Sequence, residues 1–232
     1  MCSEWPAERW FGSDTLLIVD LITNCHADLA ATESPLALGV SAARLRELKA
    51  GRAAAHHGLL AFNCDEHSIL MSETGAPIWP KGYCGSISHN QKHVCALISR
   101  TDAYVSVGVD LDDPRPIGAA AMTYVASRSE VQLAGLTIGA SGDELDRVVF
   151  CIKEAAFKCF SSVLGHTNFQ LRDTRLLLEK SSASLVVRLH QARFGTKETG
   201  TLSAAVHIFE INDAKIVFVL LPSGTHRECL IF

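Results

Sequence analysis

The chain has 232 residues, of which about half are hydrophobic and a fifth are charged, and its formal net charge is −4. This composition is ordinary for a folded protein with one large domain or two small ones. The negative charge argues against nucleic-acid binding, because proteins that bind nucleic acids are usually basic. No apolar run approaches the ~20 residues that span a bilayer. Residues 1–6 lack the basic start and apolar core of a signal peptide, so we expect a cytoplasmic protein without membrane contacts.

Eight cysteines are spread along the chain without a CxxC pair, and most have apolar neighbours. Free cysteine in such surroundings behaves as a small hydrophobic residue. A zinc site needs ligands clustered at short spacing. The histidine pairs His56–His57 and His89/His93 have no further zinc ligands close to them in the sequence. We therefore expect structural thiols and neither disulfides nor zinc.

The predicted elements of the first hundred residues begin with an apolar strand over 16–21. A helix is predicted over 41–62, where Ser41 is suited to cap it and leucines supply apolar positions (Leu45, Leu48, Leu59 and Leu60). Glycines and prolines mark residues 63–85 as a long connection. Strands are then predicted over 86–89, 93–99 and 104–111.

The second part of the chain is predicted to hold helices followed by strands. Residues 115–126 begin as a loop. Ser127 and Ser141 each stand three residues before a glutamate, which is the spacing of a helix capping box. The second of these helices runs through the apolar segment 148–164. Strands follow over 174–178, 185–190, 202–210 and 215–221, with a hairpin turn between the last two.

This order predicts an α+β fold with two halves of comparable plan, residues 1–105 and 106–232. A ligand site at the interface of the halves is the default expectation.

The segment 148–164 carries only three charged residues, Lys153, Glu154 and Lys158. A helix that is apolar on nearly all sides is usually buried, and buried charges are rare unless they are paired or bind a ligand. Glu154 and Lys158 are four residues apart and project from one helix face. An ion pair between them and a ligand site are both open at this point. Lys153 lies about 100° around the helix from Glu154, and we expect it to reach solvent or the other half.

Asp110 and Asp112 end the strand predicted over 104–111 and would point to the same face of it. Two carboxylates on one face repel each other unless a cation lies between them, and Mg²⁺ prefers such oxygen ligands. The simpler interpretation is a solvated strand end before a turn at Asp112-Asp113-Pro114.

Two further segments have features of phosphate binding. Small and hydroxylated residues precede His89, and their amides and hydroxyls suit phosphate oxygens. The helix over 41–62 carries Arg44 and Arg52, whose guanidinium groups offer forks of donors. An incidental turn and a solvated basic face are the simpler interpretations.

Three motifs together resemble a known family: Gly85-Ser86-Ile87-Ser88-His89, Gly108-Val109-Asp110-Leu111-Asp112, and Phe150-x-x-Lys153-Glu154-Ala155-x-x-Lys158. Their order and spacing resemble the 4′-phosphopantetheinyl transferases, and in particular the large monomeric surfactin-type group. The stretch from Trp79-Pro80 and the helix segment Ala50-Gly51-Arg52-Ala53-Ala54 are similar to the enterobactin-synthase branch. The resemblance runs from about residue 40 to residue 165.

The resemblance implies an enzyme that transfers the phosphopantetheine arm of coenzyme A to a serine of an apo carrier protein, releasing adenosine 3′,5′-bisphosphate. Two similar α+β halves would hold coenzyme A in the cleft between them. Asp110, Asp112 and Glu154 would hold Mg²⁺ with the pyrophosphate, and Lys158 would contact the transferred phosphate or the leaving group. Ser88 and His89 would bind phosphates of coenzyme A, and Arg52 with Arg44 would bind its 3′-phosphate end.

The expected chemistry uses Glu154 as general base, directly or through a metal-bound water, and Lys158 to compensate developing charge. The chain departs from the family pattern at three positions. Asp112 stands where many relatives have Glu, Phe150 where many have Trp, and Met71 where a basic residue often faces coenzyme A, with Lys81 as a possible substitute.

Two alternatives to the transferase stay open. One is a metal-dependent phosphoanhydride hydrolase that acts on coenzyme A, and the other is a binding module without turnover. The partner of a transferase would be a carrier domain of nonribosomal peptide synthesis, siderophore-type by the branch resemblance, or of polyketide synthesis. A monomer is expected because one chain holds both halves.

Overall fold

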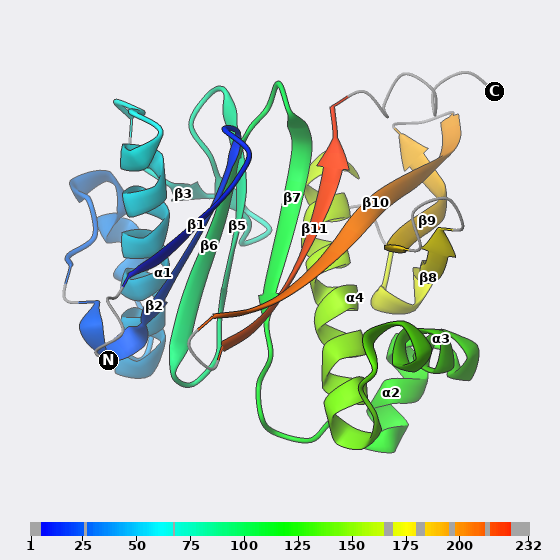
Figure 1. The fold of residues 1–232 in the computed structure, drawn as a ribbon. Coiled ribbons are helices and arrows are strands. Elements are labelled where there is room, and N and C mark those ends of the chain that lie inside the picture. Colours follow the sequence, from blue (N-terminus) through cyan, green and yellow to red (C-terminus); the bar gives the residue numbers. More distant parts are fainter. Residues whose placement is uncertain are drawn as a thin grey trace.

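Two antiparallel sheets meet over a shared apolar layer, and helices cover their outer faces (Figure 1). The computed structural model describes residues 6–25, 27–66, 68–164, 169–179, 184–194, 198–211 and 214–223. The expected mixture of helices and strands is confirmed. No helix in the described ranges is long and apolar enough to cross a membrane.

The first sheet has the strand order β1-β2-β6-β5. Its strands are β1 (Ala7–Phe11), β2 (Thr15–Leu21), β5 (Tyr83–His89) and β6 (His93–Arg100). Strand β1 was not predicted, because it is a mostly exposed edge strand without an apolar run. Helix α1 (Ala42–Ala61) packs on the outer face of this sheet, and Ser41 caps it by accepting a hydrogen bond from the Arg44 amide.

Small residues, more than leucines, bring α1 close to the sheet. Ala50, Ala54 and Ala55 are buried against strands β2 and β6, while the predicted apolar position Leu60 is 55% exposed. At Gly58 a Cβ atom would lie 2.5 Å from the Ile98 side chain. The helix therefore depends on glycine and alanine at its inner face.

The second sheet has the order β7-β11-β10-β9-β8. Its strands are β7 (Tyr104–Leu111), β8 (Thr174–Glu179), β9 (Ser184–Phe194), β10 (Glu198–Ile211) and β11 (Ala214–Pro222). Helix α4 (Gly142–Leu164) lies along its outer face, with α2 (Ala119–Val125) and α3 (Arg128–Ile138) beside it (Figure 1). Helix α2 falls in the segment predicted to begin as a loop.

Short elements complete the fold. Strands β3 (Leu70–Met71) and β4 (Pro77–Ile78) form a small ribbon inside the long connection that the sequence predicted. Three 3-10 turns are η1 (Ile22–Asn24), η2 (Ala31–Ala37) and η3 (Leu171–Asp173).

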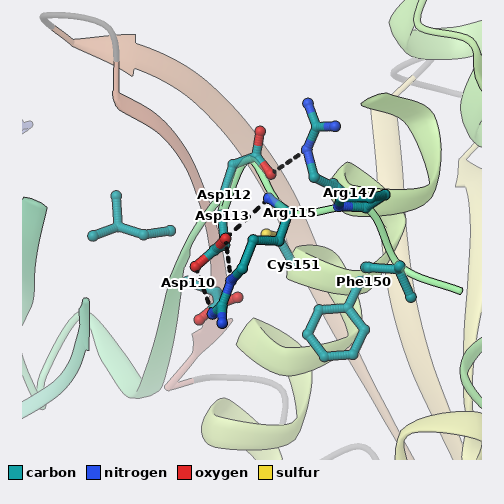
Figure 2. A pocket seen from close by; sticks show the side chains of 10 residues that line it. Asp110, Asp112, Asp113, Arg115, Arg147, Phe150 and Cys151 are labelled. Atoms are coloured by element: carbon teal, nitrogen blue, oxygen red, sulfur yellow. Dashed lines mark hydrogen bonds and ion pairs between the residues drawn. The ribbon is translucent and has the colours of Figure 1, made fainter. Parts of the chain in front are cut away.

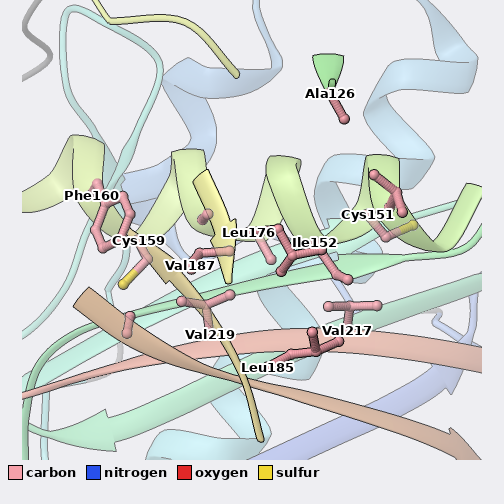
Figure 3. Packing of buried hydrophobic residues seen from close by; sticks show 14 of the residues in the cluster. Ala126, Cys151, Ile152, Cys159, Phe160, Leu176, Leu185, Val187, Val217 and Val219 are labelled. Atoms are coloured by element: carbon pink, nitrogen blue, oxygen red, sulfur yellow. The ribbon is translucent and has the colours of Figure 1, made fainter. Parts of the chain in front are cut away.

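Strand periodicity divides the core into layers. Side chains of alternate residues point to opposite faces of a strand, so Val217 and Val219 of β11 face α4 while Ile216 and Phe218 face the first sheet. Figure 3 shows Ile152, Cys159 and Phe160 of α4 packed over the valines and leucines of the second sheet. The six cysteines within the described ranges are free thiols, as expected.

Candidate active site

Edge strands β5 and β7 belong to different sheets and are joined by side chains from every second residue of β5. The Cys84 thiol donates to the Tyr104 carbonyl at 3.2 Å, and the Ser86 hydroxyl accepts from the Val109 amide at 3.1 Å. The Ser88 hydroxyl donates to Asp110 Oδ1 at 2.6 Å. The Gly-Ser-Ile-Ser-His motif and the Gly-Val-Asp-Leu-Asp motif are thereby brought side by side.

Gly108 allows helix α4 to lie directly on β7. Ser106, Gly108 and Asp110 share the face of β7 that points to α4, and a Cβ atom at Gly108 would lie 1.9 Å from the Ala155 carbonyl oxygen. Only glycine permits this approach. The contact brings the helix turn with Glu154 and Lys158 against Asp110.

Lys158 binds Asp110. Its ammonium donates to Asp110 Oδ1 at 2.7 Å, to the Ser88 hydroxyl at 3.0 Å and to the Val109 carbonyl at 3.0 Å. These contacts use all three of its donors. Among the ion pairs of the described residues, Lys158 pairs with Asp110 and not with Glu154. The interpretation of Glu154 and Lys158 as an ion pair is therefore wrong.

Glu154 lies close to Asp110 in a largely buried position. Burial raises the pKa of the Glu154 carboxyl, repulsion from Asp110 raises it further, and Lys158 opposes both. Asp110 and Glu154 fit a hard cation such as Mg²⁺, because both offer carboxylate oxygens and a cation would relieve their repulsion.

Asp112, the third predicted metal ligand, is engaged elsewhere. Its Oδ1 accepts from Arg147 Nε at 3.0 Å, and both side chains are mostly buried (Figure 2). Burial raises the pKa of Asp112, and Arg147 opposes this. In the described part of the chain no three acidic, histidine or cysteine side chains are grouped to hold a metal ion. Asp112 fits the predicted metal only after it leaves Arg147.

Figure 2 shows Asp110, Asp112 and Asp113 on the wall of a cavity of 350 Å³. Asp113 lies beside Asp112 and pairs with Arg115 at 2.8 Å. Arg147 was missed in the sequence, although a signal was available: it stands seven residues before Glu154, two helical turns away on the same face.

Residues predicted to bind phosphate line a second cavity of 270 Å³. Its walls include Arg44, Arg52, Ser88, His89 and Lys158, together with Met71 from the small ribbon. Met71 is 45% exposed at this wall, and Lys81 is not among the lining residues. The structure thus gathers the predicted phosphate ligands from α1, β5 and α4 around one space.

Arg52 is buried in the wall of that cavity with its hydrogen-bonding capacity largely unused. Its terminal nitrogen donates to the Leu70 carbonyl at 3.4 Å, and Glu33 lies 3.9 Å from Nε. Within the described ranges, Nε itself has no hydrogen-bond partner. Burial lowers the pKa of Arg52, and Glu33 opposes this. A buried guanidinium with an unmet donor matches an anionic ligand.

His89 faces both arginine and lysine. Its Nε2 lies 2.9 Å from a terminal nitrogen of Arg44. Burial lowers the pKa of His89, Glu47 raises it, and Arg44 and Lys158 lower it further. A neutral ring that accepts from Arg44 follows from this setting.

A third cavity, of 320 Å³, is more apolar and shares Lys158 with the phosphate cavity. Trp79 lies across Gly85, where a Cβ atom would be 2.5 Å from the ring. Phe157 and the buried Ser161 also line this cavity, and the Ser161 hydroxyl has no hydrogen-bond partner among the described residues. No sequence signal distinguished Ser161, since a serine in an apolar helix has no motif around it.

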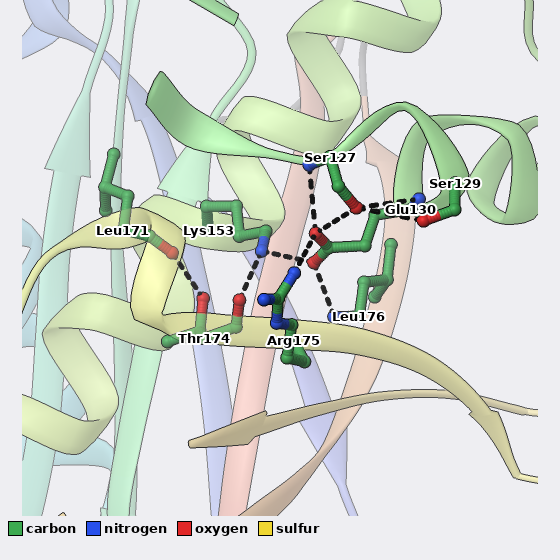
Figure 4. Close-up of polar contacts among 8 residues, drawn as sticks. All are labelled: Ser127, Ser129, Glu130, Lys153, Leu171, Thr174, Arg175 and Leu176. Atoms are coloured by element: carbon green, nitrogen blue, oxygen red, sulfur yellow. Dashed lines mark hydrogen bonds and ion pairs between the residues drawn. The ribbon is translucent and has the colours of Figure 1, made fainter. Parts of the chain in front are cut away.

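Lys153 corrects a prediction, because it reaches neither solvent nor the other half. It is fully buried and donates to Glu130 Oε1 and to the Thr174 carbonyl, each at 2.6 Å (Figure 4). Glu130 also accepts from the amides of Ser127 and Leu176. Burial raises the pKa of Glu130, but these hydrogen bonds outweigh burial and lower it to about 2. The compensating carboxylate lies in the same part of the chain as Lys153, which sequence spacing did not reveal.

Comparison with known proteins gives a consistent set of relatives. Residues 33–99 match the family model described as the 4′-phosphopantetheinyl transferase N-terminal domain. The chain is 30% identical to the 4′-phosphopantetheinyl transferase Svp of Streptomyces mobaraensis over 63% of this chain and 59% of the relative. It is 33% identical to the 4′-phosphopantetheinyl transferase PptT of Mycobacterium tuberculosis over 55% of this chain and 56% of the relative. The chain thus spans somewhat under two thirds of the length of the curated relatives it matches.

Proposed function

We propose that this chain is a 4′-phosphopantetheinyl transferase that moves the phosphopantetheine arm of coenzyme A onto a serine of an apo carrier protein. The observation that carries the proposal is the position of Lys158. Its ammonium bridges Asp110 and Ser88 and also lines the cavity of Arg44, Arg52 and His89. A cation between an acid pair and an anion-binding cavity suits phosphoryl transfer, in which charge on two phosphates must be neutralised. The matched relatives support the same activity.

In the proposed complex, coenzyme A lies between the unit of residues 1–105 and the unit of residues 106–232. Arg52 and Arg44 take its 3′-phosphate end, with His89 and Ser88 toward the pyrophosphate. The unmet Nε of Arg52 and the clustering of these side chains around one cavity support this placement. Met71 makes the site less basic than in relatives that carry a cation there, so Arg52 bears more of the binding.

Mg²⁺ would be held by Asp110 and Glu154, with Asp112 as a third ligand when it is released from Arg147. When bound, the ion neutralises pyrophosphate charge and orients the phosphates for in-line attack. The mutual repulsion of Asp110 and Glu154 supports a cation between them.

Glu154 is the proposed general base. The carrier serine oxygen forms a bond to the phosphorus that bears pantetheine, and the P–O bond to adenosine 3′,5′-bisphosphate breaks. The serine proton passes to Glu154, directly or through a water. A raised pKa makes this carboxylate a stronger base near neutral pH, and Lys158 remains close to compensate charge on the leaving group.

The finer features of the proposal come from the motif resemblance. They are a surfactin-type transferase of the enterobactin-synthase branch, a monomer in the cytoplasm, and a carrier from nonribosomal peptide (siderophore-type) or polyketide synthesis.

The deciding experiment incubates the full chain with coenzyme A, Mg²⁺ and an apo carrier protein and measures the mass of the carrier. We expect a phosphopantetheine adduct, and its loss in Glu154→Gln. The matched control is Glu144→Gln, an acid of the same helix that pairs with Lys215 on the surface and is expected to retain transfer. Breakdown of coenzyme A without a carrier adduct would favour the hydrolase. Transfer by Glu154→Gln at the rate of the unmodified chain would show that Glu154 is not the general base.

A further inference from the structure

Helix α4 presents a cation to each acid at the end of β7. Residues seven apart on a helix lie about 20° apart around its axis, and residues four apart lie about 40° apart. Arg147, Glu154 and Lys158 therefore share one face. Arg147 binds Asp112 at 3.0 Å and Lys158 binds Asp110 at 2.7 Å, so two ion pairs join the same helix and strand end with Glu154 between them along the helix.

The two pairs differ in what they do to the acids. Lys158 keeps Asp110 beside Glu154, at the place where a metal is proposed. Arg147 instead binds the carboxylate of Asp112 on the wall of the 350 Å³ cavity (Figure 2). The Asp112 main chain is fixed as well, because its amide donates to the Lys215 carbonyl and its carbonyl accepts from Asn90 at 2.7 Å. The side chain of Asp112 is therefore the part that can exchange Arg147 for a metal ion as its partner.

We infer that Arg147 is a positioning residue that competes with the metal for Asp112 and thereby lowers the affinity of the site for divalent ions. The inference rests on the proposed metal site at Asp110 and Glu154. The competition is one of position, because the bond at 3.0 Å holds the Asp112 carboxylate at Arg147, and among the described residues it is not grouped with two further acids to hold a metal ion. Metal binding through Asp112 therefore costs the Arg147 ion pair, and the released guanidinium faces the cavity.

The test measures binding of Mn²⁺ to the full chain by electron paramagnetic resonance, at a fixed concentration of coenzyme A and without carrier protein. Arg147→Gln is expected to raise Mn²⁺ affinity about fivefold, the equivalent of an ion pair worth ~1 kcal/mol. In an Asp112→Asn background the same change is expected to have no effect, because the contested ligand is gone. Arg115→Gln, which removes a charge from the same cavity wall but pairs with Asp113, is the control and should leave affinity nearly unchanged.

Each outcome decides between distinct ideas. Unchanged Mn²⁺ affinity in Arg147→Gln overturns the competition. An equal gain in affinity in the Asp112→Asn background overturns it as well, because the gain would then come from the loss of a positive charge and not from the release of Asp112. Absence of Mn²⁺ binding in both the unmodified chain and Arg147→Gln overturns the metal site itself, and with it part of the proposed function. Thermal melting checks the fold of each variant. If Arg147→Gln does not fold, Arg147→Met retains the aliphatic stem and replaces it.

Discussion

The ammonium of Lys158 lies 2.7 Å from Asp110 Oδ1 and ties the helix to the neighbouring strand. The pKa of the neighbouring Glu154 is raised by burial first and by Asp110 second, and Lys158 opposes both. The electrostatic state of the proposed base is therefore set across an interface between a strand and a helix.

The first prediction concerns Lys158→Met. Lys158 lowers the pKa of Glu154, so its removal should raise that pKa further. A general base acts in its deprotonated form, and transfer therefore rises with pH through the pKa of the base. The acid limb of kcat/KM against pH should move to higher pH, together with a loss of rate. If the acid limb of Lys158→Met lies at the same pH as that of the unmodified chain, Lys158 does not influence the pKa of the general base.

The second prediction concerns Arg52→Met. A hydrogen bond to a charged group is worth ~1.5–3 kcal/mol, so KM for coenzyme A should rise about 10- to 100-fold, with little change in kcat. Dephospho-coenzyme A, which lacks the 3′-phosphate, should be bound equally by both proteins. Arg46→Gln, a change on the same helix outside the cavity, serves as the control. A similar rise in KM for coenzyme A and dephospho-coenzyme A would show that Arg52 does not bind the 3′-phosphate.

The third prediction concerns Gly108→Ala. The added Cβ would overlap the Ala155 carbonyl, so α4 and β7 must separate, and we expect a loss of more than ~3 kcal/mol in the free energy of unfolding. Gly118→Ala is the matched control, because no atom of the described residues lies within 4 Å of its Cβ position and its φ is not positive. Denaturant unfolding measures both. Comparable stability of the two variants would show that the close contact is easily relaxed.

The fourth prediction concerns Lys153→Met, which leaves the buried Glu130 with the more exposed Arg175, at 3.5 Å, as its cationic partner. Breaking one side of a buried pair costs about 3–5 kcal/mol, and Arg175 should keep the loss toward the lower end of this range. Glu130→Gln in the same chain should recover part of this, because it removes the buried charge while its one amide oxygen can still accept from the Leu176 amide. The bond from the Ser127 amide, which goes to the other carboxylate oxygen, is lost, so the recovery is incomplete.

The same pair has a defined pH signature. The folded pKa of Glu130 is lowered from an ordinary value near 4.5 to about 2. Its contribution to stability is thus present above the unfolded pKa and is lost as pH falls from about 4.5 to 2. Lys153→Met should flatten this part of the stability curve, measured by urea unfolding at several pH values. A curve of unchanged slope would mean that other acids account for acid unfolding.

Much of the fold follows from local signals in the sequence. Runs of apolar and β-branched residues predicted β2, β6, β7 and the C-terminal strands, and Ser41 and Ser127 marked true helix starts. Strand β1 was missed because an exposed edge strand has no apolar run to detect. Leu60 was assigned to the helix interface because leucine is apolar, whereas the close packing of α1 selects alanine and glycine.

The site was predictable to the level of motifs and not of partners. Spacing placed Glu154 and Lys158 on one helix face, and the strand pattern placed Asp110 and Asp112 on one strand face. Which acid each cation binds depends on the approach of β7 to α4 and on the end of β7, both tertiary properties. The partners of Arg147 and Lys153 are therefore visible only in the folded chain.

The apolar layer between the sheets constrains how the site can open. Leu17 and Leu97 of the first sheet share this layer with Val109 and Phe218 of the second, and all four are fully buried. A hinge motion that parts the sheets would expose them to water, at about 25 cal/mol for each Å² of apolar surface. In the described chain, the faces of the two sheets that meet there are covered by this shared layer. The protein should therefore unfold as one cooperative unit, and ligands should enter by rotation of side chains such as Arg147 and Lys158 around a rigid seam.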